Sequence, residues 1–288
     1  MLSLLPPPSV PTPATTPGRA PSVSIVIPAH NEEAVIERCL KAAIDQVVPA
    51  REILVIDNRS TDATAELARR IARRHPEAGI RVLDQSEELG LVPTRNLGFE
   101  AASGDVLGRI DADTVVLRDW VARVAETMTD PAVGAVSGPV TYYDLPFRAP
   151  RGLSDDLARR ALRRLGKRYP FLYGCNMAIR ATAWRAIEHE ACRDRQDVLH
   201  EDIDLSVHLY DANVAVAYDG AMRADVSARR LSTSRESFRA YTERFERTYA
   251  AHRIDDWHLR VPQALLQSVY WWARVLRSIA PAPRAAIA

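Results

Sequence analysis

Two aspartates separated by a single alanine carry the clearest chemistry in the sequence. Asp111 and Asp113 come at the end of an apolar stretch, residues 105–110, that has the character of a β-strand. Carboxylate oxygens are ligands that Mg²⁺ and Mn²⁺ prefer, and an ion bound here would also hold phosphate oxygens. Asp113 could instead cap the helix predicted after it, because aspartate is a favoured N-cap. An isolated D-x-D triplet is weak, but its position at a strand end favours a metal site.

A second acidic group, Glu201 and Asp202, opens a predicted helix that continues to about Tyr210. Acidic side chains in a first helical turn complement the helix dipole, so no ligand is needed to explain them. A carboxylate held there beside an acceptor hydroxyl is also what a general base requires. The residues alone do not choose between Glu201 and Asp202 for that role.

Further acidic side chains follow two other predicted strands. Asp57 ends an apolar strand and could accept hydrogen bonds from a nucleotide base or from ribose hydroxyls. The helix dipole explains Glu33, whereas Glu32 stays open between that role and ligand binding. The glycine-rich phosphate loops G-x-G-x-x-G and G-x-x-x-x-G-K are absent from the sequence. A nucleotide diphosphate bound here would therefore need a cation to neutralise it.

Alternating strand-like and helix-like segments must position these residues. Runs rich in β-branched and apolar side chains predict four strands, at residues 23–27, 52–56, 80–83 and 105–110. Helical patterns follow the first three, at residues 32–44, 62–74 and 93–102. This alternation predicts an α/β fold with a mainly parallel central sheet flanked by helices. Such sheets bind ligands in the crevice beyond the carboxyl ends of their strands, which is where the acidic residues fall.

Both ends of the chain depart from that pattern. Proline recurs through residues 1–21, which predicts a disordered tail without the basic start of a signal peptide. Residues 234–251 predict a helix with an aromatic packing stripe, and residues 262–280 predict an amphipathic helix. The amphipathic helix either docks on its own domain or a partner subunit, or lies on a membrane surface. We expect a main domain at residues 22–232 and a C-terminal helical region at residues 233–288.

Composition narrows the class of protein. The 288 residues include 38 basic and 37 acidic side chains, a net charge of +1, which argues against a nucleic-acid binder. The sequence lacks an uncharged apolar span of the roughly 20 residues that a transmembrane helix needs. The cysteines, Cys39, Cys175 and Cys192, are odd in number and form no CxxC pair. They predict reduced thiols and therefore a cytoplasmic protein. Any peripheral membrane contact would then be made with the inner face of the plasma membrane.

Five segments, taken in order, resemble the successive motifs of glycosyltransferase family 2, which has the GT-A fold. The segments are Ser24-Ile-Val-Ile-Pro-Ala-His-Asn-Glu-Glu33, Glu52-Ile-Leu-Val-Ile-Asp-Asn-Arg-Ser-Thr-Asp62, Pro93-Thr-Arg-Asn-Leu-Gly98, Asp111-Ala-Asp-Thr114 and Glu201-Asp202. The resemblance covers roughly residues 22–230, so it makes the main domain a catalytic one. It implies inverting transfer of a sugar from a nucleotide-diphosphate donor to a hydroxyl acceptor, which could be a glycan, a lipid-linked sugar or a small molecule.

The resemblance also implies roles for particular residues. Donor-nucleotide contacts are expected from Pro28, Ala29, Glu32, Asp57, Arg95, Asn96 and Asp111. The donor-sugar and acceptor side is expected at Gly174, Cys175 and Asn176. Asp113, with Asp111, would bind Mg²⁺ or Mn²⁺ on the diphosphate, Asp202 would be the general base and Glu201 its companion. A single in-line displacement with these parts inverts the sugar and forms no covalent intermediate.

The sequence departs from the family pattern at several points. Asn58 and Arg59 stand where the family commonly has Asp-Gly, and Ser227-Ala-Arg-Arg230 stands where relatives often have a histidine. Arg229 or Arg230 could pair with a diphosphate or belong to a solvated basic run. The Q-x-x-R-W motif of polymerising synthases is missing, so we do not expect a polymerase.

Two other functions remain open from the residues. Asp111-Ala-Asp-Thr-Val115 resembles the nucleophile motif of haloacid-dehalogenase phosphatases, although Lys167 is the only lysine downstream of it. An inactive nucleotide-sugar binding protein is the other alternative. The presence of both Asp113 and Asp202 argues against it, and an oligomer is compatible with either function.

Overall fold

The computed structural model describes residues 19–144, 153–165, 170–191, 194, 197–255, 270 and 275. Its centre is a seven-stranded sheet with the order β3-β2-β1-β4-β8-β6-β9, in which β8 alone runs against its neighbours. The strands are β1 (Val23–Ala29), β2 (Glu52–Asp57), β3 (Ile80–Asp84), β4 (Val106–Arg109), β6 (Val133–Ser137), β8 (Met177–Arg180) and β9 (Ala215–Tyr218). Every residue of β1 and β2 is buried, as expected for strands covered on both faces.

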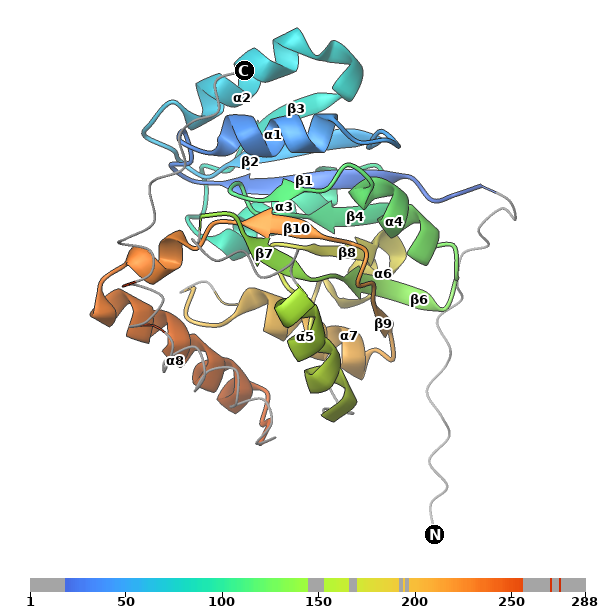
Figure 1. Cartoon of the computed structure of the whole chain (residues 1–288), viewed down its shortest axis with the longest axis vertical. Coiled ribbons are helices and arrows are strands. Elements are labelled where there is room, and N and C mark those ends of the chain that lie inside the picture. Colours follow the sequence, from blue (N-terminus) through green and yellow to red (C-terminus); the bar gives the residue numbers. More distant parts are fainter. Residues whose placement is uncertain are drawn as a thin grey trace.

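Helices form a layer on each face of this sheet (Figure 1). Side chains of α1 (Ile36–Ile44), α2 (Thr64–Arg74) and α4 (Trp120–Thr127) share one apolar cluster with the sheet. Those of α3 (Leu91–Ala101), α6 (Ala181–Ile187) and α7 (Glu201–Asp211) form a second cluster on the opposite face. The α/β class and the mainly parallel sheet that the sequence predicts are therefore confirmed.

Shorter elements and the C-terminal helix complete the described structure. A small three-stranded sheet has the order β5-β10-β7. Helix α8 lies at the far end of the molecule from α2 (Figure 1). The elements are β5 (Val115–Val116), β7 (Val140–Tyr142), β10 (Ala224–Val226), α5 (Leu153–Leu165), α8 (Arg235–Ala251) and the 3₁₀ turns η1 (Pro76–Ala78) and η3 (Arg229–Ser232). The helix predicted at residues 234–251 is confirmed, with Ser234 as its N-cap and the aromatic side chains of Phe238 and Tyr249 buried.

One local expectation and one of the alternatives are wrong. The first helix begins at Ile36 rather than at Glu32, because residues 32–35 form a turn in which the Glu32 carbonyl accepts the amide hydrogens of Val35 and Ile36. Asp113 is not the cap of the helix that follows it, since α4 begins after Asp119. Glu32 and Asp113 are therefore not explained by the termini of their own helices.

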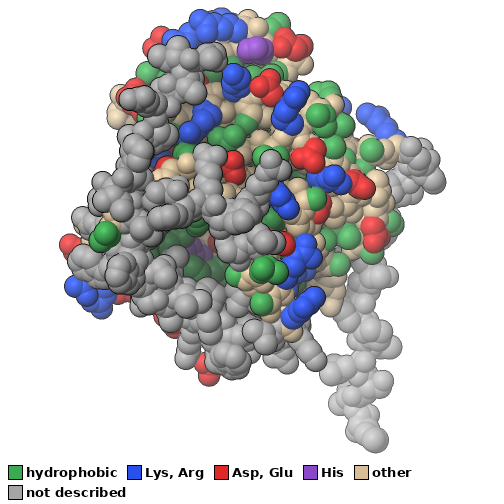
Figure 2. Space-filling view, viewed as in Figure 1, with side chains coloured by type: hydrophobic (Ala, Val, Ile, Leu, Met, Phe, Trp, Pro, Cys, Tyr) green, Lys and Arg blue, Asp and Glu red, His purple; other side chains and the backbone are tan. Residues whose placement is uncertain are grey.

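Some predictions fall on residues outside the described ranges, namely most of the tail at 1–21, Cys192 and nearly all of the helix at 262–280. Within the described ranges, no helix is long and apolar enough to cross a bilayer. Acidic and basic side chains are intermixed over the described surface of the face drawn in Figure 2. That mixture agrees with the near-neutral net charge.

Helix α3 lies unusually close to the sheet because its residue 98 is glycine. A Cβ placed on Gly98 would lie 2.3 Å from Cγ1 of Val26 and 3.0 Å from Cγ1 of Ile56. Those side chains belong to β1 and β2, whose ends carry candidate site residues. The glycine thus lets α3, with Arg95 on it, pack directly on the strands.

We expect Gly98→Ala to lower the free energy of unfolding by about 1–3 kcal/mol, although alanine is the better helix former, because the added methyl group overpacks the core. Urea denaturation measures the change. Val26→Ala in the same chain should remove the clash, so the double variant should be more stable than the sum of the two single changes indicates. Additive changes would show that the close approach does not limit stability.

Candidate active site

The carboxyl ends of β1, β2 and β4 lie next to one another and bring three predicted loops together. Ala29 is paired with Asp57 in the sheet register, and β4 adjoins β1 on its other side. The antiparallel strand β8 starts beside the end of β4, with Met177 opposite Arg109. The segment 174–176 therefore reaches the same edge as Asp111 and Asp113.

A bidentate arginine joins two of the predicted carboxylates. Arg229 Nη1 and Nη2 each lie 2.5 Å from an oxygen of Glu32, and its Nε lies 3.0 Å from Asp113 Oδ2. Burial, followed by repulsion from the Asp111 carboxylate, raises the pKa of Asp113 to about 6 although Arg229 acts in the opposite direction. The carboxylates here exceed the positive charge that Arg229 supplies, and oxygen donors of this kind suit a divalent cation. The donor set fits the metal ion that the family resemblance implies.

A buried chain of charges connects this cluster to α7. Arg109 donates to Asp111 at 2.6 Å and to Glu201 at 2.9 Å, and Arg95 donates to the second oxygen of Glu201. The side chains of Arg95, Arg109 and Glu201 are 0%, 2% and 7% exposed. Each buried charge has an opposite partner, which is the condition under which burial of ions is tolerated.

Glycine is required at position 174 by this arrangement. A Cβ there would lie 1.6 Å from Arg109 Nη1 and 2.9 Å from Glu201 Oε1. The backbone therefore passes directly over the ion pair, and the Gly174 amide donates to Asp202 Oδ2 at 3.0 Å. Fixed in this way, the carboxylate of Asp202 lies beside the segment 174–176.

Asp202 and Glu201 occupy different environments at the start of α7. Glu201 is buried between two guanidinium groups, whereas Asp202 is partly exposed. Burial and then repulsion from Glu201 raise the pKa of Asp202 to about 6, against the opposing hydrogen bond from Gly174. A carboxylate with that pKa and access to solvent can accept a proton near neutral pH, and Glu201 is held in ion pairs.

Cys175 lies within electrostatic range of both acidic groups. Burial raises the pKa of its thiol to about 12, and the carboxylates of Asp111 and Asp202 both act in that direction. The thiol is therefore protonated and is not a nucleophile. Asp111 and Asp202 are 91 positions apart in the chain, and both lie near Cys175 in the folded structure.

The loop after β2 contains one incompletely bonded acid and two positioning residues. Asp57 is 7% exposed, and its Oδ1 atom is buried with no hydrogen-bond partner within the described structure. Asn58 donates to the carbonyl groups of Gln85 and Glu88 and accepts from the Gly90 amide. Arg59, with φ +58°, donates to the carbonyl of Ser86 at 2.8 Å. Asn58 and Arg59, the residues of this loop that depart from the family pattern, thus hold the segment 85–90 in place.

The side chains of two predicted site residues have no exposed surface. Arg95 has no exposed surface and bonds Glu201 and Asn96. Asn176 is also fully buried, where it accepts from the Trp120 indole and donates to the carbonyl groups of Pro139 and Met222. In this structure both act on the site through their neighbours. Pro28 and Ala29 are buried in β1, whereas the side chain of Asn96 is partly exposed.

The sequence analysis missed Arg109 and left the role of Arg229 undecided. Arg109 is the last residue of an otherwise apolar, fully buried strand, and a charged residue there signals a buried partner. Arg229 gave no such local signal. It is 197 positions from Glu32, so their contact exists only in the folded chain.

The family model described as "Glycosyl transferase family 2" matches residues 24–189. The chain belongs to glycosyltransferase family 2. A second model, "Glycosyl transferase family group 2", matches residues 109–283. The recognition made from the motifs is thereby confirmed for more than half of the chain.

Curated relatives match less than half of the chain. Glycosyltransferase AglE of Haloferax volcanii is 35% identical over 124 residues, which are 42% of this chain and 40% of that protein. An N-acetylglucosaminyltransferase of Rhizobium meliloti is 30% identical over 124 residues, 42% of this chain and 29% of that protein. The chain thus matches less than half the length of these relatives.

Solved structures share the fold over most of the chain. The mannosyltransferase PcManGT of Pyrobaculum calidifontis, in complex with GDP-Man and Mn²⁺, has a TM-score of 0.65 at 22% identity and covers 92% of this chain and 75% of its own. S. aureus TarS in complex with UDP-GlcNAc has a TM-score of 0.58 at 14% identity and covers 87% and 71%. The GT-A type of α/β fold is confirmed by this likeness.

We expect Glu201→Gln to lower the free energy of unfolding by about 3–5 kcal/mol, because it leaves two buried guanidinium groups facing a neutral amide. Chemical denaturation at pH 7.5 measures the loss. Glu126→Gln is the matched control, because Glu126 pairs with Arg123 on the surface. Their side chains are 72% and 39% exposed. The control should change stability by less than about 1 kcal/mol. A similarly small change in Glu201→Gln would contradict the structural role of the charge chain.

Proposed function

We propose that this protein transfers a sugar from a nucleotide-diphosphate donor to a hydroxyl acceptor with inversion at the sugar. The observation that carries the proposal is Asp202, a partly exposed carboxylate whose pKa is raised to about 6, at the sheet edge that also holds Asp111 and Asp113. Membership in glycosyltransferase family 2 and the nucleotide-sugars bound to its structural neighbours support it. Family membership also disfavours the phosphatase alternative.

Asp202 is the general base of this proposal. The acceptor hydroxyl loses its proton to the carboxylate as the oxygen attacks the anomeric carbon, and the nucleotide diphosphate leaves from the opposite face. The Gly174 amide donates to one carboxylate oxygen and the Ile203 amide to the other, so both oxygens are fixed and each keeps a lone pair that can face the acceptor. Glu201 is a positioning residue, held by Arg95 and Arg109 at the start of the same helix.

Asp113 and Asp111 would hold a divalent cation, Mg²⁺ or Mn²⁺, against the diphosphate. Such an ion supplies Lewis-acid stabilisation of the charge that develops on the leaving group. Mn²⁺ in the complex of PcManGT supports this cofactor. In the structure Arg229 holds Asp113 and Glu32 instead, so donor binding would release its guanidinium, which can then pair with a phosphate.

The remaining predicted residues would bind the donor around this centre. The unpartnered Oδ1 of Asp57 is suited to accept a ribose hydroxyl or a base imide hydrogen. Backbone at Pro28 and Ala29, and the side chain of Asn96, would border the nucleotide. The backbone of Gly174 and Cys175 would border the donor sugar and the acceptor.

The limits of the catalytic domain belong to the same proposal. We assign it to residues 22–232, which include Arg229, with a tail at 1–21 and a C-terminal helical region at 233–288. A cytoplasmic location and membrane contact through residues 262–280 stay predictions. A lipid-linked acceptor would make that contact useful.

We expect Asp202→Asn to lower kcat by about 10²–10⁴-fold while donor binding is retained, because the amide oxygen still accepts one of the two backbone hydrogen bonds that hold the carboxylate but the side chain cannot take a proton. A thermal-shift panel of UDP-, GDP- and dTDP-sugars, with and without Mn²⁺, identifies the donor. Release of the nucleotide with candidate acceptors then measures turnover. Asp211→Asn, on the exposed last turn of the same helix, is the control. A variant at position 202 as active as the wild type would overturn the assignment.

The same base predicts the pH dependence of the reaction. Since the deprotonated carboxylate is the active form and its pKa is about 6, log kcat at saturating donor and Mn²⁺, where a bound ion would keep Asp113 deprotonated, should rise with slope one below pH 6 and level off above it. A profile that falls as the pH rises through 6 would indicate that this group acts as an acid. The alternative of an inactive nucleotide-sugar binding protein has its own test. It would be favoured by wild-type protein that binds a donor but releases no nucleotide, either to water or to any acceptor.

We expect Arg229→Met to strengthen Mn²⁺ binding to the donor-free protein by up to about tenfold, because the ion no longer competes with a guanidinium for Asp113 and Glu32. Titration followed by Mn²⁺ electron paramagnetic resonance measures the free ion. Arg230→Met is the control, since that neighbouring guanidinium lies over the Tyr241 ring at 4.1 Å instead. Unchanged or weaker Mn²⁺ binding in Arg229→Met would contradict the competition.

A further inference from the structure

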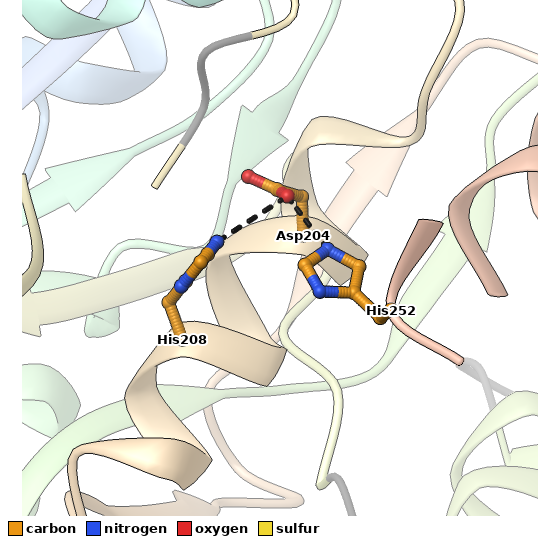
Figure 3. A group of neighbouring side chains, drawn as sticks. All are labelled: Asp204, His208 and His252. Carbon is orange, nitrogen blue, oxygen red and sulfur yellow. Dashed lines mark hydrogen bonds and ion pairs between the residues drawn. The ribbon is translucent and has the colours of Figure 1, made fainter. Parts of the chain in front are cut away.

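A carboxylate and two imidazoles meet between α7 and α8 (Figure 3). Asp204 Oδ1 lies 2.7 Å from His252 Nε2 and 3.6 Å from His208 Nε2. One candidate ligand atom from each residue lies within 4.8 Å of the other two. Their side chains are 9%, 14% and 19% exposed for Asp204, His252 and His208. We infer that these three residues form a Zn²⁺ site, separate from the carboxylate cluster at Asp113.

The two helices hold these ligands in place. Asp204 and His208 are four residues apart on α7, so they share one face across a single turn. His252 ends α8, where its amide donates to the carbonyl of Thr248. An apolar cluster packs the helices together around the group, formed by Ile203, Val207, Tyr249 and Ile254 with Phe171 and Phe245 against it. Ligands on packed helices need little reorganisation to bind an ion.

The chemistry of the three ligands suits Zn²⁺. Two imidazole nitrogens and one carboxylate oxygen form a common zinc set, with a water in the fourth position. Bonds of about 2.0–2.1 Å in tetrahedral geometry separate ligand atoms by roughly 3.3 Å, and the observed 2.7 and 3.6 Å lie on either side of that value. By contrast, the all-carboxylate set at Asp111 and Asp113 suits Mg²⁺ or Mn²⁺.

An outer carboxylate completes the arrangement. Glu190 Oε2 lies 4.0 Å from Nδ1 of His208, the ring nitrogen that faces away from Asp204. Metal-bound histidines characteristically donate their second nitrogen to a carboxylate, which fixes the ring and strengthens the ligand. A small approach of Glu190 would make that hydrogen bond.

The site is structural with respect to the proposed transfer. Asp204 follows Asp202 by two residues, and at about 100° per residue the two side chains point to nearly opposite sides of α7. An ion bound to Asp204 would tie the end of α8 to the helix that begins with Asp202. Zinc binding should therefore raise the melting temperature without being needed for turnover.

The test uses the full chain, stripped of metal with a chelator and kept in excess Mg²⁺ to occupy oxygen-only sites. Competition with a chromophoric chelator should show one equivalent of Zn²⁺ bound, and Co²⁺ in its place should give visible d–d bands. His208→Gln and His252→Gln should each weaken Zn²⁺ binding by more than about 100-fold, and Glu190→Gln by roughly tenfold. His189→Gln, a neighbouring histidine with 85% of its side chain exposed, is the control and should bind as wild type.

Circular dichroism and the zinc-dependent rise in melting temperature distinguish a lost site from a lost fold. His208 is the more exposed of the two histidines. If His252→Gln does not fold, His208→Gln is therefore the variant that we expect to stay folded. Absence of Zn²⁺ binding by the wild type in Mg²⁺, or equal binding by His208→Gln, would overturn the proposal and leave a hydrogen-bonded cluster. Either result is separate from the proposed function, whose assays contain Mg²⁺ or Mn²⁺ and no Zn²⁺.

Discussion

The arrangement of the candidate site depends on one buried carboxylate held between two arginines. Glu201 is bound by Arg95 from α3 and by Arg109 from β4, so these two consecutive elements meet the distant helix α7 at a single side chain. A buried charge without its partner costs several kcal/mol, so the three elements cannot move apart independently. Arg109 extends this constraint to Asp111. The spacing between the acidic loop after β4 and the start of α7 follows from these contacts.

The same ion pair dictates the backbone that crosses it. Only glycine fits against Arg109 at position 174, and the absence of a side chain lets the amide reach Asp202. The residue best placed as a base is thus oriented by a backbone group whose position is fixed by a buried arginine. The raised pKa of Asp202 has the same origin, because burial and the adjacent Glu201 both disfavour its charged form. One local arrangement supplies both the position and the proton affinity of this carboxylate.

The sequence predicts the elements and the strand-end loops but not the pairing between them. Apolar β-branched runs mark β1, β2 and β4 because a strand buried on both faces needs such side chains. β3, at the edge of the sheet, is only partly buried and carries a shorter apolar run. Local pattern also places the acidic residues after those strands. It contains no signal that pairs Arg109 with Glu201, 92 positions away, or Arg229 with Glu32, 197 positions away. The start of α1 at Ile36 was missed for a related reason, since the turn before it is held by contacts to the α2 loop, including the Glu32 amide donating to Thr64.

Charge balance connects three arginines to the proposed reaction. Acidic groups of this edge include Asp57 and Asp202, together with Glu32, Asp111, Asp113 and Glu201, whose ion-pair partners are Arg95, Arg109 and Arg229. A diphosphate brought to this edge adds further negative charge, which a cation would have to offset. Arg95 and Arg109 are buried and paired with Glu201, so neither can be released without breaking a buried ion pair. Arg229 is the most exposed of the three, with 47% of its side chain accessible, and it holds carboxylates that a divalent ion could take over. Exchange of Arg229 for an ion would leave the buried charge chain intact and free one guanidinium for the phosphate, which is why the pairing with Asp113 is compatible with donor binding.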